Sequence, residues 1–305
     1  MQNQFSLSGL VAATHTPFHA DGGLHLDAIE KQAAHLLSWN VHAVFIGGTT
    51  GESQSLTLDE RLALARRWMD VTRGTPMQVI VHTGSNCLED SAVLAADAQK
   101  IGAAAVSALA PSYFKPATVD LLVECCLRTA QAAPATPFYF YHIPPLTGVS
   151  FPAVEFLQRA SSRIPNLAGL KFTAPDLMGC MQCLRQNDGQ WNILWGFDEW
   201  LLGALAIGVR GGVGSSYNFA APISQRLIAA FEKGDLTAAR TEQWRSVQLI
   251  ALVSKYGYMA AAKEIMAMLG VDVGKARLPH GSLEEAQVRN LRGDLETLGF
   301  FDWLR

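Results

Sequence analysis

The sequence has no excess of basic residues and no long apolar run, and these two gaps exclude whole classes of protein. Its 24 Lys and Arg residues against 27 Asp and Glu residues give a formal net charge of −3, so we expect no nucleic-acid partner. No uninterrupted apolar stretch is long enough to cross a bilayer, and we expect no membrane partner. The first residues lack a basic start followed by an apolar segment, so we expect no signal peptide.

Cysteines are few and form no disulfide framework. The five cysteines are an odd number without regular spacing, which favours reduced thiols and a cytoplasmic protein. Cys180 and Cys183 form a C-x-x-C pair, but two small residues on one helix face are the simpler interpretation. His82 and His142 end apolar runs without an acidic partner at ligand spacing, so we expect satisfied core or rim histidines and no metal.

A G-x-G-x-x-G phosphate loop after an early strand is also missing, which argues against a doubly wound dinucleotide-binding sheet. What the 305 residues do contain is an alternation of short apolar runs and longer helical patterns. Eight strand–helix units in about 220 residues predict a (β/α)8 TIM barrel, an α/β fold. We expect the barrel over residues 1–222 and a C-terminal helical appendage, packed on it, over residues 223–305. The expected strands cover residues 9–13, 42–46, 78–82, 103–109, 138–142, 167–172, 193–196 and 211–214.

Lys171 lies in a short apolar run over residues 167–173. Burying an ammonium group is costly, and the group responds by losing its proton. A neutral Lys amine attacks ketones and can form a Schiff base. The alternative is a surface side chain that extends its charge into solvent. The pattern therefore makes Lys171 a candidate nucleophile.

Tyr141 ends the apolar run that precedes the one with Lys171. Because the active site of a TIM barrel lies at the carboxyl ends of its strands, polar residues at these ends are candidates for chemistry. Tyr141 could also be an aromatic core residue with a satisfied hydroxyl. Thr173 lies two residues beyond Lys171 and should face the same way, as should Gly169, which we expect to leave space beside the amine. A Tyr and a Lys so placed are the working parts of a Lys-dependent aldolase.

Thr49 and Thr50 lie in a glycine-rich stretch, residues 47–52, after the second expected strand. Glycines let a backbone approach a ligand closely, and successive N–H groups in such a turn form an anion-binding nest. The two hydroxyls add donors, so the stretch suits a small carboxylate. A plain turn before a helix is the alternative.

Gly196, Asp198 and Glu199 follow the seventh expected strand, and Ser215 follows the eighth. Paired acids at a strand end can accept hydrogen bonds from sugar hydroxyls. They can also cap a helix, since Asp and Glu are favoured in a first turn. Ser215 offers a small hydroxyl donor to the same expected mouth.

At these residues the sequence resembles the dihydrodipicolinate synthase/N-acetylneuraminate lyase family of class I aldolases, over essentially its whole length. The resemblance implies a (β/α)8 barrel with three C-terminal helices, a homotetramer, and no metal or organic cofactor. It implies a keto sugar acid and pyruvate as the small molecules bound. The motifs that carry it are G-G-T-T-G-E at 47–52, Y-F-Y-H-I-P at 139–144, G-L-K-F-T at 169–173 and G-S-S-Y-N at 214–218.

The resemblance also implies residue roles. Lys171 would form the Schiff base and Tyr141 would shuttle the proton. Thr49 and Thr50 would bind the pyruvoyl carboxylate, with Thr49 also in the proton relay. Tyr113 matches a Tyr that this family lends to the neighbouring subunit's site, although a serine precedes it where an aromatic residue is usual.

Three positions separate the branches of this family. The synthase branch carries an Arg two residues after its Tyr-x-x-Pro motif, and this chain has Leu146 there, which removes a bidentate carboxylate partner. Thr173 and the Gly-Phe-Asp-Glu segment at 196–199 fit the lyase branch, whose acids hold a sugar's hydroxyl tail. Residues 139–148 are especially similar to the animal-type lyases.

These features together imply an aldolase that reversibly cleaves N-acetylneuraminate to N-acetylmannosamine and pyruvate. One alternative is another aldolase of the family, which acts on a different 2-keto-3-deoxy sugar acid or makes dihydrodipicolinate. The other is a non-catalytic barrel that binds a keto acid. His142 and Phe197 stand where they could influence substrate range.

Overall fold

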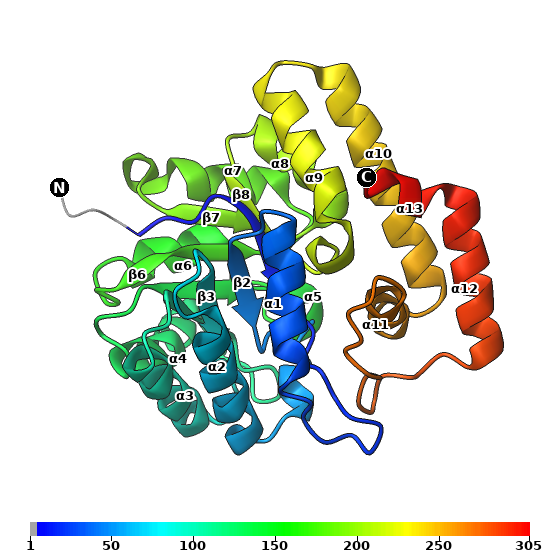
Figure 1. Ribbon diagram of the computed structural model, residues 1–305. Helices are drawn as coiled ribbons and strands as arrows, with labels where there is room; N and C mark the ends of the chain where they lie inside the picture. The colour runs from blue at the N-terminus through cyan, green and yellow to red at the C-terminus, as the bar shows by residue number, and fades with distance from the viewer. Residues whose placement is uncertain (1–4) are drawn as a thin grey trace.

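The computed structural model describes residues 5–305 as a closed parallel barrel with a group of helices beside it (Figure 1). The strands follow one another around the barrel in chain order, and β8 closes it by pairing with β1. The predicted (β/α)8 barrel with a C-terminal helical region is confirmed. The strands are β1 (Gly9–Ala13), β2 (Ala43–Ile46), β3 (Gln78–His82), β4 (Ala105–Leu109), β5 (Phe138–His142), β6 (Leu167–Phe172), β7 (Asn192–Trp195) and β8 (Gly211–Gly214).

Helices surround the strands, and their first residues explain where several of them begin. Thr57 and Glu60 form a reciprocal capping box before α2, and the Thr118 hydroxyl accepts from a backbone N–H at the start of α4. The barrel helices are α1 (Ala28–Ser38), α2 (Leu58–Thr72), α3 (Leu88–Lys100), α4 (Val119–Gln131), α5 (Pro144–Thr147), α6 (Ala153–Ala160), α7 (Leu177–Arg185) and α8 (Leu201–Ala206), with 3-10 turns η1 (Ser53–Ser55), η2 (Gln186–Gly189) and η3 (Asp198–Trp200).

Side chains alternate between the inside of the barrel and the surrounding helices. Phe45 packs in the inner core, whereas Val44 and Ile46 pack against the helices. The glycine-rich strand β8 is explained by what lies beside it. A Cβ at Gly214 would overlap the Asp198 carboxylate, so only glycine fits there.

The C-terminal helices build a second apolar core beside the barrel (Figure 1). Helix α9 belongs to both cores, because Leu227 packs with the barrel while Phe219 and Ile223 pack with the C-terminal helices. The expected division at residue 222 falls inside this shared helix and stays a prediction. The helices are α9 (Tyr217–Glu232), α10 (Leu236–Lys255), α11 (Tyr258–Met268), α12 (Glu285–Leu298) and α13 (Phe300–Trp303).

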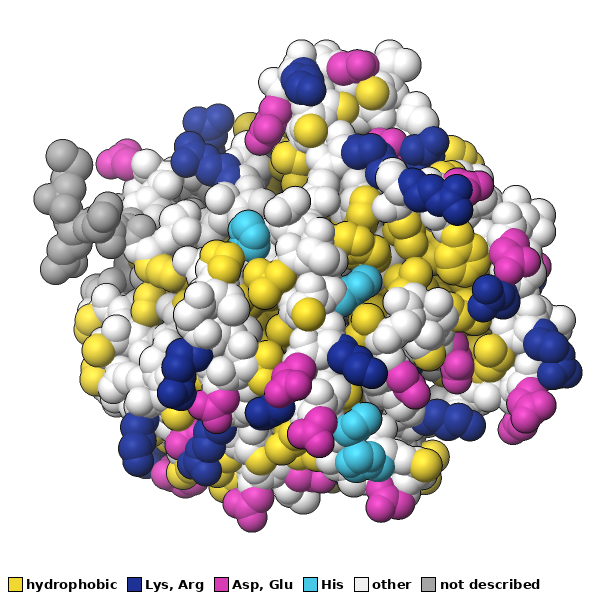
Figure 2. Space-filling view, in the orientation of Figure 1, with side chains coloured by type: hydrophobic (Ala, Val, Ile, Leu, Met, Phe, Trp, Pro, Cys, Tyr) yellow, Lys and Arg dark blue, Asp and Glu magenta, His cyan; other side chains and the backbone are white. Residues whose placement is uncertain are grey.

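The surface carries charges of both signs. On the face in Figure 2, Lys and Arg side chains lie interspersed with Asp and Glu side chains. Within residues 5–305, no helix combines the length and the apolar character that crossing a membrane requires.

Candidate active site

Lys171 is buried in the inside of the barrel, near the carboxyl end of β6. It lies opposite Tyr141 in the β5–β6 ladder and is 5% exposed. Its Nζ lies 4.1 Å from the centroid of the Tyr141 ring and 4.2 Å from that of Phe45. A cavity of only about 10 Å³ adjoins it, lined otherwise by Leu7, Val11, Phe45, Ile80, Tyr139, Leu194 and Val213. The amine therefore stands in apolar surroundings, and the surface alternative is wrong.

Burial lowers the pKa of Lys171 to about 7, and the Asp198 carboxylate opposes part of this shift. About half of the amine is therefore neutral near pH 7. A neutral, positioned amine is the form that adds to a ketone. Within residues 5–305 the amine has no ion-pair partner within 4 Å, so only the two ring faces and the more distant Asp198 carboxylate favour its protonated form.

We expect Lys171→Met to raise the free energy of unfolding at neutral pH. The folded-state pKa of about 7 lies below the ordinary 10.5, so the unfolded chain binds this proton more tightly. The cost of burying the amine is fully present below pH 7, declines as the pH rises, and is lost above about pH 10.5. Urea titrations at about pH 7 and pH 10 should show a gain of a few kcal/mol that shrinks at the higher pH. A larger gain at the higher pH would contradict the assignment.

Tyr141 and Thr49 meet across the barrel mouth. The Tyr141 hydroxyl lies 3.2 Å from Thr49 Oγ1, and either oxygen could be the donor. Burial raises the pKa of Tyr141 to about 12, so the phenol is protonated at neutral pH. Tyr141, Thr49 and Lys171 thus form one cluster although they come from three different segments of the chain.

The turn that carries Thr49 and Thr50 depends on its glycines. Gly47 has a φ of +59°, which a glycine adopts without strain. A Cβ at Gly51 would lie 2.9 Å from the Gly47 backbone nitrogen, so the turn can close this tightly only without a side chain there. Thr50 is buried and Thr49 half-buried. The turn therefore directs both residues towards the barrel rather than into bulk solvent.

Thr173 and Gly196 are adjacent at the ends of β6 and β7. A Cβ at Gly196 would overlap the Thr173 hydroxyl, which explains the glycine. Thr173 Oγ1 is buried and has no hydrogen-bond partner among the described residues. A buried hydroxyl without a partner is rare in folded proteins, and a bound ligand would satisfy this one.

Asp198 is fully buried against β8. Its Oδ2 accepts from the backbone N–H of Ser216 at 2.9 Å and from the Ser216 hydroxyl at 2.5 Å. Burial raises the pKa of both Asp198 and the half-buried Glu199. Both acids lie in the first turn of η3, as the capping alternative also predicts, although neither side chain forms a capping hydrogen bond there.

Ser215 is paired with a residue that sequence reasoning missed. Its Oγ lies 2.7 Å from the hydroxyl of Tyr258, the first residue of α11. No local motif marks Tyr258, and only the packing of the C-terminal helices brings it to the mouth.

Tyr113 lies apart from this cluster, in the loop after β4, with 79% of its surface exposed. The Asn86 side chain fixes the loop, since its Oδ1 accepts the Tyr113 backbone N–H at 3.0 Å. The Tyr113 ring packs edge-on against Phe114, which is also exposed. The loop thus exposes two aromatic rings to solvent and is held in place by Asn86.

Two sequence expectations are wrong here. Gly169 does not make room for the amine, because a Cβ there would overlap the backbone of Asn192 in β7. The β5–β6 ladder shifts register at this point, which breaks the simple alternation. His82 is not satisfied, since both ring nitrogens are buried without a partner among the described residues. Burial lowers its pKa, so it is a neutral ring packed edge-on against Tyr141.

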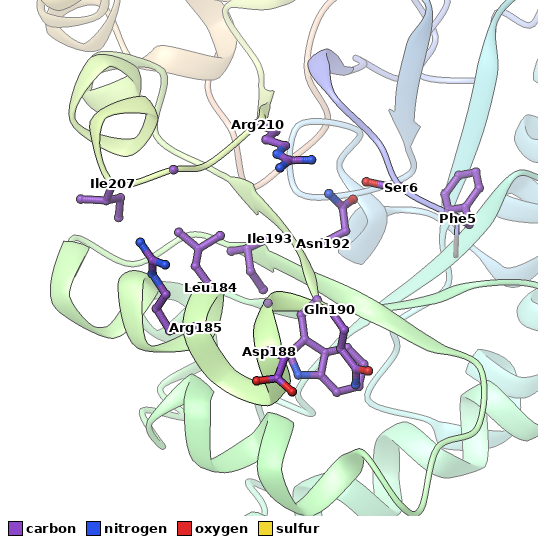
Figure 3. Close-up of a pocket in the computed structure, with 13 residues that line it drawn as sticks. Phe5, Ser6, Leu184, Arg185, Asp188, Gln190, Asn192, Ile193, Ile207 and Arg210 are labelled. Atoms are coloured by element: carbon purple, nitrogen blue, oxygen red, sulfur yellow. The ribbon is translucent and has the colours of Figure 1, made fainter. Parts of the chain in front are cut away.

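A cavity of about 790 Å³ opens at the other end of the barrel (Figure 3). Ser6, Asn192 and Arg210 line it, each at or before the start of a strand. It holds neither a buried amine nor the glycine-rich turn. Because barrel enzymes place their chemistry at the carboxyl ends of the strands, we assign the candidate site to the cluster around Lys171.

Comparison with known proteins agrees with this fold. A model of the dihydrodipicolinate synthetase family matches residues 6–298. The N-acetylneuraminate lyase of Gallus gallus is 39% identical over 296 residues, which are 96% of this chain and 96% of that protein. N-acetylneuraminate lyase A of Xenopus laevis is 41% identical over 276 residues, 90% of each. The solved structure of Proteus mirabilis N-acetylneuraminate lyase has a TM-score of 0.94 at 38% identity, covering 97% of this chain and 100% of that one. The predicted membership is confirmed, and the chain belongs to the dihydrodipicolinate synthetase family.

Proposed function

We propose that this chain is a Schiff-base aldolase that reversibly cleaves N-acetylneuraminate to N-acetylmannosamine and pyruvate. The observation that carries the proposal is the buried Lys171 amine, with a pKa of about 7, beside the Tyr141–Thr49 hydroxyl pair. Relatives that span nearly the whole chain are named N-acetylneuraminate lyases, which supports the choice of sugar acid.

The first half of the reaction makes an electron sink. The neutral Lys171 amine adds to the C2 ketone of the open-chain sugar acid, and the carbinolamine loses water to give an iminium ion. Covalent attachment in this way divides one difficult bond cleavage into easier steps. The mostly apolar side chains around the amine lower its pKa, so that a large fraction is neutral and nucleophilic when the ketone arrives.

The second half breaks the carbon–carbon bond. As the carbinolamine loses its hydroxide, Tyr141 gives up its proton through Thr49 so that water leaves. The resulting phenolate takes the proton of the C4 hydroxyl, the C3–C4 bond breaks, and its electrons form an enamine on Lys171. N-Acetylmannosamine leaves as the aldehyde. Over the cycle the proton lost from the C4 hydroxyl is returned to C3 of the enamine, and Thr49, 3.2 Å from the phenol, serves as the relay. Water then hydrolyses the imine and releases pyruvate.

The remaining residues bind and orient the substrate. Thr49 and Thr50, with the N–H groups of their turn, hold the carboxylate and fix the ketone for attack. Thr173, Gly196, Glu199 and Ser215 line the part of the mouth that receives the polyol tail. Asp198 contributes Oδ1 to a hydroxyl, since both bonds from Ser216 end on Oδ2.

We further propose that the protein works as a homotetramer in the cytoplasm. The exposed Tyr113 loop would then complete the site of a neighbouring subunit. All five cysteines are free, which suits a reducing compartment. The buried thiols of Cys180 and Cys183 have pKa values raised to about 12, so they are unreactive there.

The experiment that tests this function is pyruvate release from N-acetylneuraminate by the purified protein. Dihydrodipicolinate formation and cleavage of other 2-keto-3-deoxy sugar acids are measured alongside. Release from N-acetylneuraminate with the highest kcat/KM supports the proposal. A preference for another sugar acid would change the proposed substrate and leave the proposed aldolase activity standing. No pyruvate release from any of them would overturn the proposed function.

We expect imine formation to rise with pH through about 7. Below the Lys171 pKa of about 7 the amine is protonated and cannot attack, and above it the neutral fraction approaches one. Initial rates of borohydride trapping with pyruvate, from about pH 5.5 to 9, should climb about tenfold per pH unit at the acid end and then level off. A profile that rises only above about pH 9 would show an ordinary, solvated lysine.

A further inference from the structure

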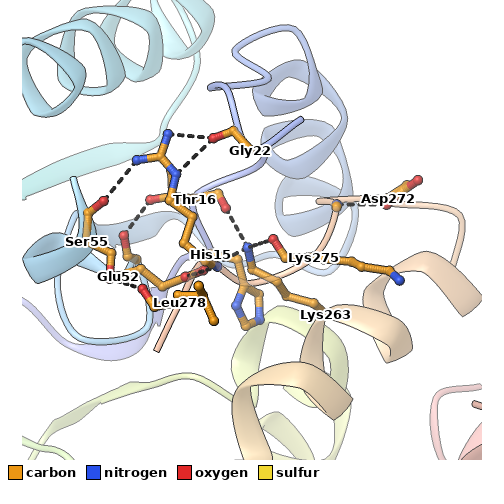
Figure 4. A network of polar contacts seen from close by, with 12 residues as sticks. His15, Thr16, Gly22, Glu52, Ser55, Lys263, Asp272, Lys275 and Leu278 are labelled. Carbon is orange, nitrogen blue, oxygen red and sulfur yellow. Dashed lines mark hydrogen bonds and ion pairs between the residues drawn. The ribbon is translucent and has the colours of Figure 1, made fainter. Parts of the chain in front are cut away.

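The turn that carries Thr49 and Thr50 is attached through Glu52 to the C-terminal helical region (Figure 4). Glu52 Oε1 lies 2.8 Å from Nζ of Lys263, a residue of α11, and the two side chains are 0% and 2% exposed. Glu52 Oε2 accepts the backbone N–H of Arg277 at 2.8 Å. Both carboxylate oxygens are therefore engaged by residues more than two hundred positions away in the chain.

Lys263 is also linked to the same turn through Thr16. Its ammonium group donates to the carbonyl of Thr16 at 2.9 Å and to that of Lys275 at 3.3 Å. The Thr16 hydroxyl in turn donates to the carbonyl of Gly51 at 2.6 Å. The ammonium group thus lies against one carboxylate, as an ion pair, and donates to two carbonyls.

The backbone of Glu52 needs such support. Its φ of 54° and ψ of 37° lie in the left-handed region, which residues other than glycine, asparagine and aspartate seldom adopt. The Glu52 N–H donates to the carbonyl of Thr49 at 3.0 Å, so its conformation sets that of Thr49 directly. A strained backbone persists where surrounding contacts determine it, and such places are frequent at ligand-binding turns.

Buried side chains surround the Glu52–Lys263 ion pair and exclude water from it. Phe18 is buried, and its ring centroid lies 4.4 Å from Lys263 Nζ and 4.3 Å from the Arg277 guanidinium carbon. His15 is buried beside Lys263, and burial together with that charge lowers its pKa to about 3, so it adds no second cation. A buried pair with its geometry fixed in this way specifies one arrangement of the turn.

We propose that Lys263 is a positioning residue of the active site, which acts through Glu52 and Thr16 to hold Thr49 and Thr50 where a keto acid's carboxylate binds. The inference rests on the proposed function, since it takes the turn to be the carboxylate site. It gives the C-terminal helical region a part in substrate binding, although Lys263 itself touches no reacting atom.

The test compares two ketones, one with a carboxylate and one without. Borohydride trapping on Lys171 is titrated with pyruvate and with acetone in wild type and in Lys263→Met. We expect the half-saturating pyruvate concentration to rise at least about tenfold, while acetone trapping stays within about twofold of wild type. An equal loss for both ketones would indicate general damage to the barrel and overturn the proposal, as would no change for either.

A second variant covers the case in which Lys263→Met does not fold, because it leaves the Glu52 carboxylate buried without its counterion. The double variant K263M/E52Q removes both charges and keeps the acceptor for the Arg277 N–H. It should fold and show the same selective loss of pyruvate binding. Glu242→Gln is the matched control, since Glu242 is an ion-paired acid with a buried side chain in α10, remote from the turn, and should leave both titrations unchanged.

Hydrogen exchange separates this proposal from the proposed function. In K263M/E52Q the amides of residues 47–56 should exchange at least about tenfold faster than in wild type, while β5 and β6 keep their protection. The exchange measurement needs no ligand, so it decides whether Lys263 holds the turn even if the wild type fails to trap pyruvate. A wild type that does not trap pyruvate would instead overturn the assignment of the turn as the carboxylate site. Unchanged exchange over these residues would overturn the role of Lys263.

Discussion

Lys171→Ala is expected to abolish trapping of pyruvate by borohydride and to lower kcat for N-acetylneuraminate cleavage by on the order of 10⁴-fold or more. The physical reason is that no other group at this site can become the covalent electron sink. The lysine nearest the turn, Lys263, is held by Glu52 and the carbonyl of Thr16. Coupled detection of released pyruvate and mass spectrometry of the trapped adduct give the two readouts.

Lys171→Arg is the control for the charge. An arginine keeps a cation in this place but does not lose its proton and does not form a Schiff base. Both variants should therefore be inactive, and circular dichroism should show that the alanine variant retains the fold. Residual activity within about tenfold of wild type in the alanine variant would remove Lys171 from the mechanism.

Tyr141→Phe is expected to lower kcat by about 10²- to 10⁴-fold while imine formation with pyruvate continues. The ring packing beside the Lys171 amine is preserved, so the amine keeps its apolar surroundings and its lowered pKa. What is lost is the hydroxyl that receives the C4 proton. The measurement is kcat for cleavage beside borohydride trapping of pyruvate on the same preparation.

Thr49→Val is the companion variant for the proton path. It removes the oxygen 3.2 Å from the phenol and leaves the phenol in place. Its kcat should fall less than that of Tyr141→Phe if Thr49 acts as a relay. An unchanged kcat in Tyr141→Phe would sink the assignment of Tyr141 as the proton shuttle.

Much of the fold followed from local pattern. The alternation of apolar runs and helical periods predicted the parallel barrel, and the runs at 78–82 and 138–142 coincide with β3 and β5. The seventh strand begins and ends one residue earlier than expected, at Asn192 and Trp195. The alternation of side chains along a strand is a local property. Successive residues point in turn into the barrel and towards the surrounding helices, whichever strands lie next to it.

The candidate nucleophile could also be found from the sequence, because a lysine within an apolar run is unusual by itself. Its neighbour in the ladder, Tyr141, followed from the rule that barrel chemistry lies at strand ends. Gly169 was misjudged, since alternation fails where the β5–β6 register shifts. A register shift is decided by the pairing of two strands and cannot be read from either one.

The sequence by itself determined the barrel, the buried amine and the glycine-rich turn, because each depends on residues close together in the chain. Only the tertiary structure decided that the Asp198 carboxylate lies against β8, that Tyr258 meets Ser215, and that Lys263 holds Glu52. These contacts join segments that are distant in sequence. Their partners are chosen by the packing of whole helices on the barrel, and no local pattern of residues encodes that choice.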